Sequence, residues 1–398
     1  MNILIAVSGS IAAYKAPDIC RGLVNSGHKV KVVLSKGALE FVNPKVFNYL
    51  GVENTYLPED DFSHKGVLHI ELSKWLDSFV LVPASANTLA KLSHGECPDL
   101  LTSIFLSLEP SKIRVLYPAM NTFMYQNTIT QENLNKLKTL PKTYIIPPDS
   151  GVLACGDEGP GKMPDVRSIV EMVPTYTGKR SFKSVVITAG ATLSNLDPVR
   201  YVTNPAKGGS SYLLAKKYLS EGYLVKVIKG QEVIEDFKYL EKHPNYESHT
   251  VSTTSDLLEK VKQFSDFDIY ISPMAVSDIE FDYVDSKIKK STLQKSLNFK
   301  FAPDVLAYVL QNKKHYQQIV GFAAETSLSD SVIQEKITRK PVDLLVANLV
   351  NSGFNNKSKQ GFGTRNGTYK LVSPIGVVGE YNNLDKSELA NIIFSLIK

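Results

Sequence analysis

The chain has 398 residues, with 45 lysines and arginines against 40 aspartates and glutamates, and 43% of its residues are hydrophobic. These values are ordinary for a globular protein of about two domains. The net charge of +5 is too small and too spread along the sequence to argue for nucleic acid, and it suits small anionic ligands equally well, so no nucleic acid partner is expected. No apolar run is long enough to span a bilayer, so no membrane association is expected.

The cysteines and the N-terminal residues indicate the compartment. Cys20, Cys97 and Cys155 are odd in number and lack the spacing of zinc ligands, which argues against a disulfide framework and structural zinc. Residues 1–7 contain no basic segment and predict a strand instead of a signal peptide. We therefore expect a cytoplasmic protein.

The first half of the chain alternates short apolar runs with helical patterns. Strands are predicted over residues 3–7, 30–34, 79–82 and 113–117, and helices over residues 11–25, 87–92 and 131–137. Because buried strands that alternate with helices form parallel sheets, this half predicts a doubly wound α/β domain.

The same pattern restarts after a polar stretch without periodicity. Residues 174–183 predict a linker between a first domain at 1–173 and a second domain at 184–398. In the second domain, strands are predicted from residue 184 and over residues 224–228, 268–272, 318–321 and 343–346, with helices over residues 213–219, 257–264 and 386–397. The fold class that we predict is therefore α/β, with two doubly wound, mostly parallel, Rossmann-like domains.

Small and polar residues follow several predicted strands of the first half. They are Ser8, Gly9 and Ser10, residues 83–88, and residues 118–121, and residues 99–103 add hydroxyls at the start of a helix-like run. In an open parallel sheet, ligands bind beyond the carboxyl ends of the strands, and a glycine lets the backbone approach a phosphate. Ile11 and Ala12 break the Gly-x-Gly-x-x-Gly fingerprint, so we expect a nucleotide held differently from NAD. Taken singly, residues 83–88, 99–103 and 118–121 are each more often an ordinary turn or helix cap, but four such polar loops in one half of the chain favour a ligand site.

Two further residues are candidates for chemistry. His69 lies between Leu68 and Ile70 in a half-buried pattern, where a histidine is either structural or a proton carrier. Cys155 lies within residues 154–163, a glycine-rich segment that argues against helix or strand and favours a shaped, mobile loop. The thiol is either incidental or reactive, and Lys162 is placed to activate it or to hold an anion.

In this order and spacing, residues 8–15, His69 and residues 83–88, 118–121 and 154–163 resemble the FMN-dependent cysteine decarboxylases. They are most similar to the phosphopantothenoylcysteine decarboxylase half of the bifunctional coenzyme A biosynthesis enzymes. The resemblance implies a flavodoxin-like, FMN-binding first domain. The FMN contacts that it implies are Ser8, Gly9, Ser10, Ser35, Ala84, Ser85, Asn87, Thr88, Thr102 and Ser103.

The same resemblance implies catalytic roles in the first half. His69 is the expected active-site base, Asn121 orients the substrate carboxylate, and Cys155 is the acid on a substrate clamp that includes Lys162 and Met163. In this family FMN oxidises the substrate thiol to a thioaldehyde, which accepts the electrons released when CO₂ leaves. The clamp is expected to open for substrate and to close against water.

The second half contains its own candidate phosphate site. Residues 188–192 and 208–211 are small-residue loops, and Arg200 and Asn204 lie between them in the sequence. Residues 287–290, Lys287 to Lys290, form a short basic run. Basic residues beside small-residue loops suit a triphosphate, although most basic runs are solvated surface.

These segments resemble the phosphopantothenate–cysteine ligase half of the same family. The resemblance implies that CTP activates 4′-phosphopantothenate as an acyl-cytidylate, which L-cysteine then attacks, while Mg²⁺ and lysines offset the charge of the departing pyrophosphate. It implies catalytic roles for Arg200, Asn204 and Lys287. The substrate and nucleotide contacts that it implies are Gly190, Asp278, Lys289, Phe322, Ala323, Lys336, Lys340 and Asn348, with Asp278 also the candidate ligand of Mg²⁺.

The second half departs from the family pattern at several positions. Ala191 replaces a glycine, Leu193 and Ser194 replace Arg-Glu, residues 206–211 from Ala206 to Ser211 replace Ser-Ser-Gly-Lys-Met-Gly, and Phe301 and Ala302 replace Lys-Asn. A lost charged contact to phosphate costs roughly 1.5–3 kcal/mol. The sequence favours an active ligase, with altered affinity or nucleotide choice and partial loss of activity as alternatives.

Two other functions compete with this one. A decarboxylase of another cysteine carboxylate is disfavoured by the ligase-like half, and a non-catalytic FMN-binding regulatory or assembly protein by the presence of His69, Asn121 and Cys155. The resemblance also implies a homo-oligomer built on trimers of the first domain, in which a neighbouring copy completes the flavin site. Small molecules are the expected partners.

Overall fold

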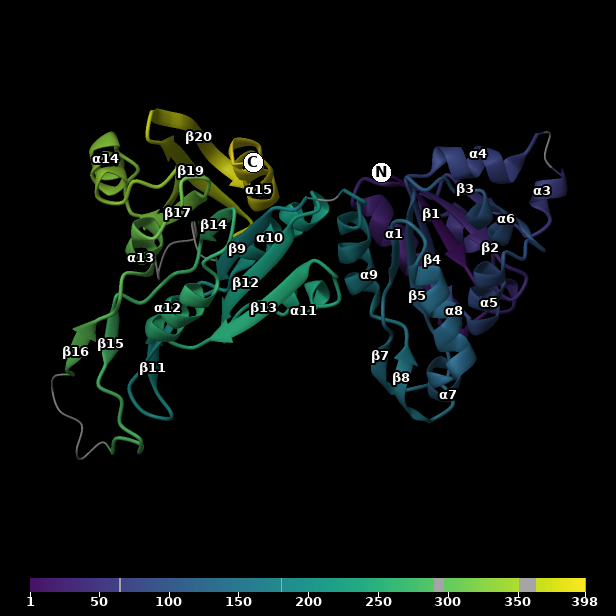
Figure 1. The fold of residues 1–398 in the computed structure, drawn as a ribbon, viewed down its shortest axis with the longest axis horizontal. Coiled ribbons are helices and arrows are strands. Elements are labelled where there is room, and N and C mark those ends of the chain that lie inside the picture. Colours follow the sequence, from purple (N-terminus) through teal and green to yellow (C-terminus); the bar gives the residue numbers. More distant parts are fainter. Residues whose placement is uncertain (64–65, 180, 290–296, 351–362, 398) are drawn as a thin grey trace. The chain divides into compact units, whose positions relative to one another are not determined.

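A computed structural model describes residues 1–63, 66–179, 181–289, 297–350 and 363–397 (Figure 1). The chain divides into two compact units, Met1–Lys179 and Arg180–Lys398. The predicted linker at 174–183 spans this division, but its start is packed into the first unit, where the 3-10 helix η3 (Val173–Thr175) is followed by the buried Tyr176. The centroid of the Tyr176 ring lies 4.7 Å from that of Tyr144. Within the described ranges, every helix is too short or too polar to reach across a bilayer.

Six parallel strands form the sheet of the first unit (Figure 1). They are β1 (Asn2–Val7), β2 (Lys29–Leu34), β3 (Asn54–Tyr56), β4 (Ser78–Ala84), β5 (Ile113–Pro118) and β6 (Thr143–Ile145), in the spatial order β3-β2-β1-β4-β5-β6. All of β4 is buried, as expected for a strand covered on both faces. The strand order reverses between β1 and β4, so the first strand lies inside the sheet.

Helices cover both faces of this sheet. On one side, α1 (Ala16–Asn25) and α9 (Val166–Met172) approach closely because Gly22 lies against Val170. On the other side, α4 (Leu68–Trp75), α5 (Ala86–His94), α6 (Leu100–Leu106) and α8 (Thr128–Lys138) form one apolar core with the sheet. The remaining helices are short: η1 (Ile11–Lys15), η2 (Ala38–Glu40), α2 (Lys45–Asn48), α3 (Asp60–Ser63) and α7 (Thr122–Gln126).

The predicted strands and helices of the first unit are present, with one difference. The helix predicted over residues 11–25 is divided into η1 and α1. Pro17 lies in the first turn of α1, where its missing N–H and its ring are tolerated, whereas inside a continuous helix both would break the hydrogen-bond ladder.

The second unit has an eight-stranded sheet. Its strands are β9 (Ser184–Ala189), β12 (Leu224–Gly230), β13 (Tyr246–Val251), β14 (Ile269–Ser272), β17 (Gln318–Glu325), β18 (Leu344–Leu349), β19 (Asn366–Ser373) and β20 (Gly376–Asp385), in the order β13-β12-β9-β14-β17-β18-β19-β20. The six strands from β13 to β18 are parallel and repeat the order of the first sheet, and β19 and β20 continue it antiparallel. The prediction of two doubly wound, mostly parallel domains is therefore confirmed.

The second unit also contains elements that the sequence does not predict. The predicted helices correspond to α10 (Gly209–Ser220), α12 (Thr254–Gln263) and α15 (Lys386–Leu396), and α11 (Phe237–Leu240), α13 (Val305–Gln311) and α14 (Asp330–Arg339) are additional. Two small hairpins pair β10 (Leu193–Asn195) with β11 (Tyr201–Thr203) and β15 (Ile279–Phe281) with β16 (Phe299–Phe301). Their strands have three residues each, too few to show a period of two in the sequence.

Candidate functional site

The carboxyl ends of β1 and β4 are joined where the strand order of the first sheet reverses. The Ser8 hydroxyl donates to the carbonyl oxygen of Pro83 at 2.8 Å and accepts from the backbone N–H of Ser85 at 2.8 Å. Ser8 is completely buried, so its hydroxyl holds the two loops together and is not free for a ligand. In open α/β sheets this point is the usual ligand site.

Loops after two further strands meet the same edge. A Cβ atom on Gly9 would lie 2.9 Å from the Cα atom of Gly37, so the loop that follows β2 touches the loop that follows β1 backbone to backbone. The Ser10 hydroxyl caps η1 and donates to the carbonyl oxygen of Ala119, beyond β5, at 3.1 Å. The structure thus brings Ser10, Ser35, Ser85 and Ala119 to one edge, each at the end of a different strand.

The other predicted flavin contacts divide into two kinds. The Ser85 hydroxyl caps α5, and the buried Thr102 hydroxyl completes the capping box of α6 by accepting from the N–H of the N-cap residue Asp99, so both side chains already serve local structure. The Ser35 hydroxyl accepts from the N–H of Ala38 at 3.3 Å. Ala84 and Thr88 are buried, whereas Asn87 is exposed and Ser103 half-buried, and the described structure gives the last two no side-chain partner.

The segment around Cys155 is not the irregular loop that its glycines predict. Residues Glu158–Lys162 form strand β8, which pairs antiparallel with β7 (Asp149–Val152), and Cys155 lies in the turn between them. Gly161 has φ +152°, and a Cβ atom there would lie 2.2 Å from the carbonyl oxygen of Met120. The glycines of β8 therefore permit close backbone contact with the segment beyond β5, because they have no side chain to hold the two segments apart.

This β7–β8 hairpin places Cys155 beside Asn121. The Gly161 carbonyl accepts from the N–H of Met120 at 3.1 Å, which fixes the hairpin against the start of α7. The Asn121 Nδ2 atom lies 3.3 Å from Cys155 Sγ and 2.6 Å from Asp157 Oδ2. Cys155 Sγ lies 3.3 Å from the same carboxylate oxygen. An amide donor, a thiol and a carboxylate thus form one exposed cluster, of which only Asp157 was not predicted.

Two residues of the predicted clamp differ in exposure. Lys162 is exposed and its side chain runs alongside Gly151 on the neighbouring strand. Met163 is 2% exposed, so its side chain belongs to the core.

His69 has a partner that the sequence analysis missed. Its Nδ1 atom lies 2.9 and 2.8 Å from the two carboxylate oxygens of Asp61, and its backbone N–H donates to Asp61 Oδ1 at 3.2 Å. The two residues lie on α4 and α3, and no regular spacing in the sequence connects them.

In the second unit, the equivalent edge of the sheet is closed by backbone pairing. Ala191, after β9, forms a parallel bridge with Ala275, after β14. The Ser277 N–H donates to Thr192 Oγ1 at 2.8 Å, and Asn204 Nδ2 lies 3.4 Å from the carbonyl oxygen of Ala275. Gly190 turns the chain here with φ +86°. Asn204 thus lies beside the β14 loop, in which the N–H of Ala275 donates to the carbonyl oxygen of Gly190 at 2.9 Å.

Arg200 is held by a buried carboxylate. Its Nε and one terminal nitrogen donate to Asp197 Oδ2 at 3.0 and 2.5 Å, and that terminal nitrogen also donates to the carbonyl oxygen of Ile288 at 2.9 Å. The Arg200 guanidinium holds the pKa of Asp197 well below its usual range, and backbone N–H groups that Asp197 accepts from act in the same direction. Arg200 and the basic run, 88 residues apart, are thereby brought together.

The remaining predicted ligase residues are scattered over the unit. Lys287 and Asp278 are exposed, as is Lys289, and Lys290 lies outside the described residues. Lys336 and Lys340 are each paired with a carboxylate, Glu325 and Asp304, at 2.6 Å. Phe322, Ala323 and Asn348 lie near the carboxyl ends of β17 and β18, and the buried Asn348 Oδ1 atom has no hydrogen-bond partner within the described residues.

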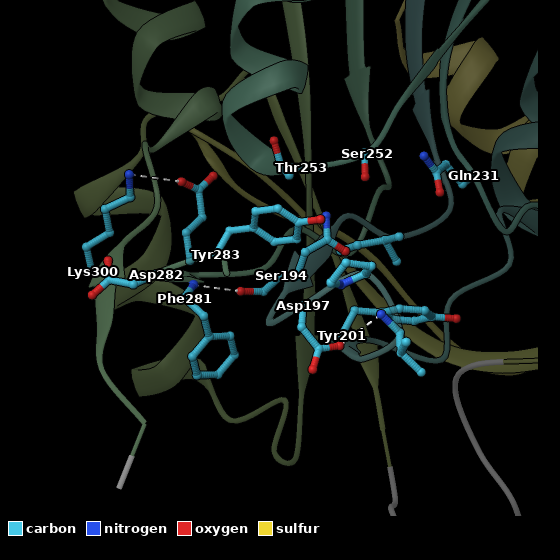
Figure 2. A pocket seen from close by; sticks show the side chains of 15 residues that line it. Ser194, Asp197, Tyr201, Gln231, Ser252, Thr253, Phe281, Asp282, Tyr283 and Lys300 are labelled. Carbon is cyan, nitrogen blue, oxygen red and sulfur yellow. Dashed lines mark hydrogen bonds and ion pairs between the residues drawn. The ribbon is translucent and has the colours of Figure 1, made fainter. Parts of the chain in front are cut away.

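A cavity of roughly 640 Å³ lies beside the two small hairpins (Figure 2). Its lining includes Leu193, Ser194, Asp197, Tyr201, Gln231, Thr253, Glu280, Tyr283 and Lys300. The Ser194 hydroxyl accepts from the N–H of Phe281 at 3.1 Å, and Lys300 Nζ lies 3.7 Å from Glu280 Oε2. Of the residues assigned a role in the sequence analysis, none lines it, although the departures Leu193 and Ser194 do.

The other departures also have structural places. Ala206 is buried, and the Ser211 hydroxyl donates to the carbonyl oxygen of Thr188 at 2.9 Å. Lys207 Nζ pairs with Glu232 at 2.6 Å. Phe301 is 84% exposed on β16. Ala206, Ser211 and Lys207 are therefore accommodated by packing, a hydrogen bond and an ion pair, whereas the Phe301 ring is left exposed.

A protein-held metal is not supported by the donor set. Among the described residues there is no group of three or more His, Cys, Asp or Glu side chains that could hold an ion. The exposed Asp278 is a single donor, so it does not by itself make a site for Mg²⁺.

Comparisons with known proteins cover both units. A family model described as Flavoprotein matches residues 1–177, and one described as DNA/pantothenate metabolism flavoprotein C-terminal domain matches residues 181–398. The coenzyme A biosynthesis bifunctional protein CoaBC of Vibrio vulnificus is 34% identical over 366 residues, covering 89% of this chain and 88% of the relative. The CoaBC protein of Borreliella burgdorferi is 30% identical over 407 aligned residues, which cover 100% of this chain and 98% of the relative. A solved structure of a PPC decarboxylase variant complexed with pantothenoylaminoethenethiol is 36% identical, covers 43% of this chain and 95% of that chain, and has a TM-score of 0.40.

Proposed function

This chain belongs to the family of bifunctional coenzyme A biosynthesis proteins, and from that premise we propose how its two units divide the reactions. The family joins a flavoprotein decarboxylase to a ligase, and this chain is such a two-function enzyme. We propose that the second unit joins L-cysteine to 4′-phosphopantothenate through an acyl-cytidylate made from CTP. The first unit then decarboxylates 4′-phosphopantothenoylcysteine to 4′-phosphopantetheine.

FMN fits the edge of the first sheet where β1 and β4 end. The backbone contact between Gly9 and Gly37 leaves no space for a Cβ atom, and the helices capped by Ser10 and Ser85 direct backbone N–H groups to this edge, as a phosphate-bearing cofactor requires. Ser8 and Thr102 would support FMN through the loops they hold, while Asn87 and Ser103 are free to contact it directly. When bound, FMN supplies the two-electron oxidation of the substrate thiol and the return of those electrons.

The contact between Asn121 and Cys155 carries the proposal for the first unit. The β7–β8 hairpin brings these residues, 34 positions apart, to 3.3 Å. Asn121 holds the substrate carboxylate with its amide N–H, and Cys155 donates a proton to the substrate carbon after CO₂ has left. His69 takes a proton from the substrate during the oxidation. Lys162 and the buried Met163 position the hairpin residues that meet the substrate.

In the second unit, we place acyl-cytidylate formation near Arg200, Asn204 and Lys287. The hydrogen bonds of Arg200 with Asp197 and Ile288 support this, because they bind the basic run to the segment that holds Arg200. Arg200 and Lys287 would offset the negative charge of the acyl phosphate, and the Asn204 amide would orient it. CTP is proposed to contact Gly190, Lys289, Phe322, Ala323, Lys336, Lys340 and Asn348. Mg²⁺ is proposed to enter with CTP, and no step is assigned to a metal held by Asp278.

The remaining features of the proposal concern organisation. We propose a decarboxylase domain that extends from residue 1 through the buried Tyr176, a linker shorter than the predicted 174–183, and a ligase domain that begins with β9 at Ser184. A homo-oligomer built on trimers of the first domain is supported by exposed apolar side chains near the flavin edge, among them Ile11, Tyr14 and Phe123, which a neighbouring copy would cover. A cytoplasmic location follows from the proposed use of CTP.

Two measurements test the proposal. The purified protein is expected to be yellow or to become yellow with FMN, and a colourless protein that takes up no FMN would overturn the assignment of the first unit. With 4′-phosphopantothenate, L-cysteine and CTP, the full chain is expected to release CMP and to form 4′-phosphopantetheine. Absence of the nucleoside monophosphate with every nucleoside triphosphate would overturn the assignment of the second unit.

A further inference from the structure

The pairing of His69 with Asp61 is unusually complete for two residues on different helices. Both Asp61 oxygens lie within 2.9 Å of His69 Nδ1, and one of them also accepts the backbone N–H of His69 at 3.2 Å. The Asp61 side chain is 9% exposed, against 30% for His69. A buried carboxylate therefore holds both the ring and the main chain of the proposed base.

The position of this carboxylate has a structural reason. The residue at the N-cap of α4 is Val67, which provides no side-chain cap, and His69 is in the first turn of that helix. Asp61 supplies the missing acceptor from α3, where a negative charge is also favoured by the dipole of α4. Because the Asp61 carboxylate accepts from the backbone N–H of His69 and also contacts its imidazole, it both caps α4 and fixes the orientation of the ring.

The contact also determines which imidazole nitrogen carries the proton. An ionised carboxylate only accepts hydrogen bonds, so the nitrogen that faces it must be an N–H. The neutral ring then has its hydrogen on Nδ1 and its lone pair on Nε2. Only Nε2 is left to accept a proton.

We propose that Asp61 is a positioning residue for the decarboxylase reaction, which holds His69 in the Nδ1–H tautomer so that Nε2 is the atom that accepts the proton. This inference rests on the proposed role of His69 as the base. Asp61 itself does not contact substrate or flavin in the proposal, and it acts through the ring that it orients.

The first test needs no change at Asp61. In the ¹⁵N-histidine-labelled full chain at alkaline pH, where imidazoles are neutral, the His69 signal is expected to show a protonated Nδ1 and a bare Nε2. The chain has seven histidines, so the signal is assigned by its loss in His69→Gln. A His69 signal with the proton on Nε2 overturns the proposal.

The second test separates positioning from folding. In the FMN-loaded full chain, Asp61→Asn is expected to lower kcat for decarboxylation by roughly 100-fold, the lower range of what a general base contributes, with KM changed by less than about twofold. The matched control is Glu59→Gln, which removes an exposed carboxylate two residues away and is expected to leave kcat unchanged. In both variants, flavin absorbance reports folding of the first unit, and CMP formation reports that the second unit is intact.

The outcomes distinguish this inference from the proposed function. If His69→Gln turns over normally, the role of His69 as base is wrong. If His69→Gln is inactive while Asp61→Asn keeps both the wild-type kcat and the Nδ1–H tautomer, the base stands and the role of Asp61 is overturned. If Asp61→Asn fails to fold, the His69 tautomer measured in the unmodified protein still tests the role of Asp61.

Discussion

The two units share one strand order but use the centre of their sheets differently. In the first unit, β1 and β4 are joined only up to Ser8, Pro83 and Ser85, and beyond this point Gly9 turns against Gly37. In the second, pairing continues beyond β9 and β14 through the Ala191–Ala275 bridge to Thr192 and Ser277. The same topology thus joins the loops after β1 and β4 through the Ser8 hydroxyl in one unit, and joins the corresponding loops by continued backbone pairing in the other.

This difference matters for where chemistry is placed. In the first unit, the β7–β8 hairpin adds Cys155 and Asp157 to a residue beyond a strand end, Asn121. In the second, the connection between β10 and β11 contains Arg200, whose guanidinium is joined to Asp197 and to the Ile288 carbonyl oxygen. A shared fold therefore predicts the edge at which a site is built, and the added hairpins decide its composition.

The largest effects are expected from substitutions that disable one unit each. Cys155→Ser should lower the formation of 4′-phosphopantetheine by roughly 100-fold or more, because the proton donor is lost, while CO₂ is still released and an oxidised ene-thiol product accumulates. Lys287→Ala should abolish CMP formation and spare decarboxylation of supplied 4′-phosphopantothenoylcysteine. Mass spectrometry of the products checks both.

The control for Cys155→Ser is Cys97→Ser, which changes another exposed thiol of the same unit. Its turnover should equal that of the parent protein. Normal turnover in Cys155→Ser would remove Cys155 from the acid role and, with it, the main chemical contrast between the units.

A second pair of substitutions tests the backbone contacts themselves. A Cβ atom would lie 2.2 Å from the Met120 carbonyl oxygen in Gly161→Ala and 2.2 Å from the Ala191 carbonyl oxygen in Gly230→Ala. Each should shift one site by a fraction of an ångström to an ångström and lower only its own activity, by on the order of 100-fold. Measuring both CMP formation and decarboxylation in each variant shows whether only one activity is lost.

The matched control here is Gly156→Ala in the hairpin turn. Its Cβ atom would meet nothing within 4 Å, although φ is +88°. The expected cost is backbone strain of about 1–2 kcal/mol, with a much smaller loss of decarboxylase activity than in Gly161→Ala. Equal losses would mean that flexibility, and not close contact, explains the glycines.

Arg200→Lys should have an intermediate effect on the ligase. Lysine keeps the charge but lacks the planar guanidinium, whose several N–H groups join Asp197 to the Ile288 carbonyl oxygen. CMP formation should therefore fall roughly tenfold. Arg339→Lys, at an exposed position of α14, is the control and should be unaffected. If Arg200→Lys forms CMP at the rate of the unsubstituted protein, the guanidinium contacts do not position the ligase site.

The smallest expected effect is a dependence of local stability on pH. Because its folded pKa is lowered, Asp197 stabilises the segment around Arg200 fully above the ordinary aspartate pKa, and this stabilisation is lost as pH falls through the lower folded value. Hydrogen exchange of the backbone N–H groups of Val199 and Arg200, which donate to Asp197, should be flat from pH 8 to about pH 5 after correction for intrinsic rates, and should rise only below about pH 4. Asp197→Asn should remove that acid-dependent rise, and a rise that begins near neutral pH would contradict the assignment.

Much of the fold follows from sequence patterns because the central strands are continuous apolar runs. The runs in β1, β4 and β9 are too short for typical helices, and the small residues after them mark the sheet edge. The helix break at Pro17 was also readable from proline chemistry, although a single helix was predicted there. The short hairpins lack such signals, since three-residue strands show no period.

The candidate sites were predictable in part. Asp157 lies two residues after Cys155, inside the segment already singled out, so a carboxylate next to the thiol was visible in the sequence. Asp61 was not, because a change of helix separates it from His69. Spacing alone also does not reveal that the buried hydroxyls of Ser8 and Thr102 already have partners in their own loop and capping box, so their predicted role toward FMN becomes one of support.

The interior position of the first strand of each sheet has a consequence for how the chain is made. During synthesis, β1 emerges long before β4, its partner across the sheet, and β9 long before β14. Each apolar first strand must therefore wait, unpaired on one side, while about 70 to 80 residues are added. Nascent chains that end just before β4 or β14 should be the forms that chaperones bind most strongly. Once β4 or β14 has left the ribosome, it can pair with the waiting strand and cover its free edge.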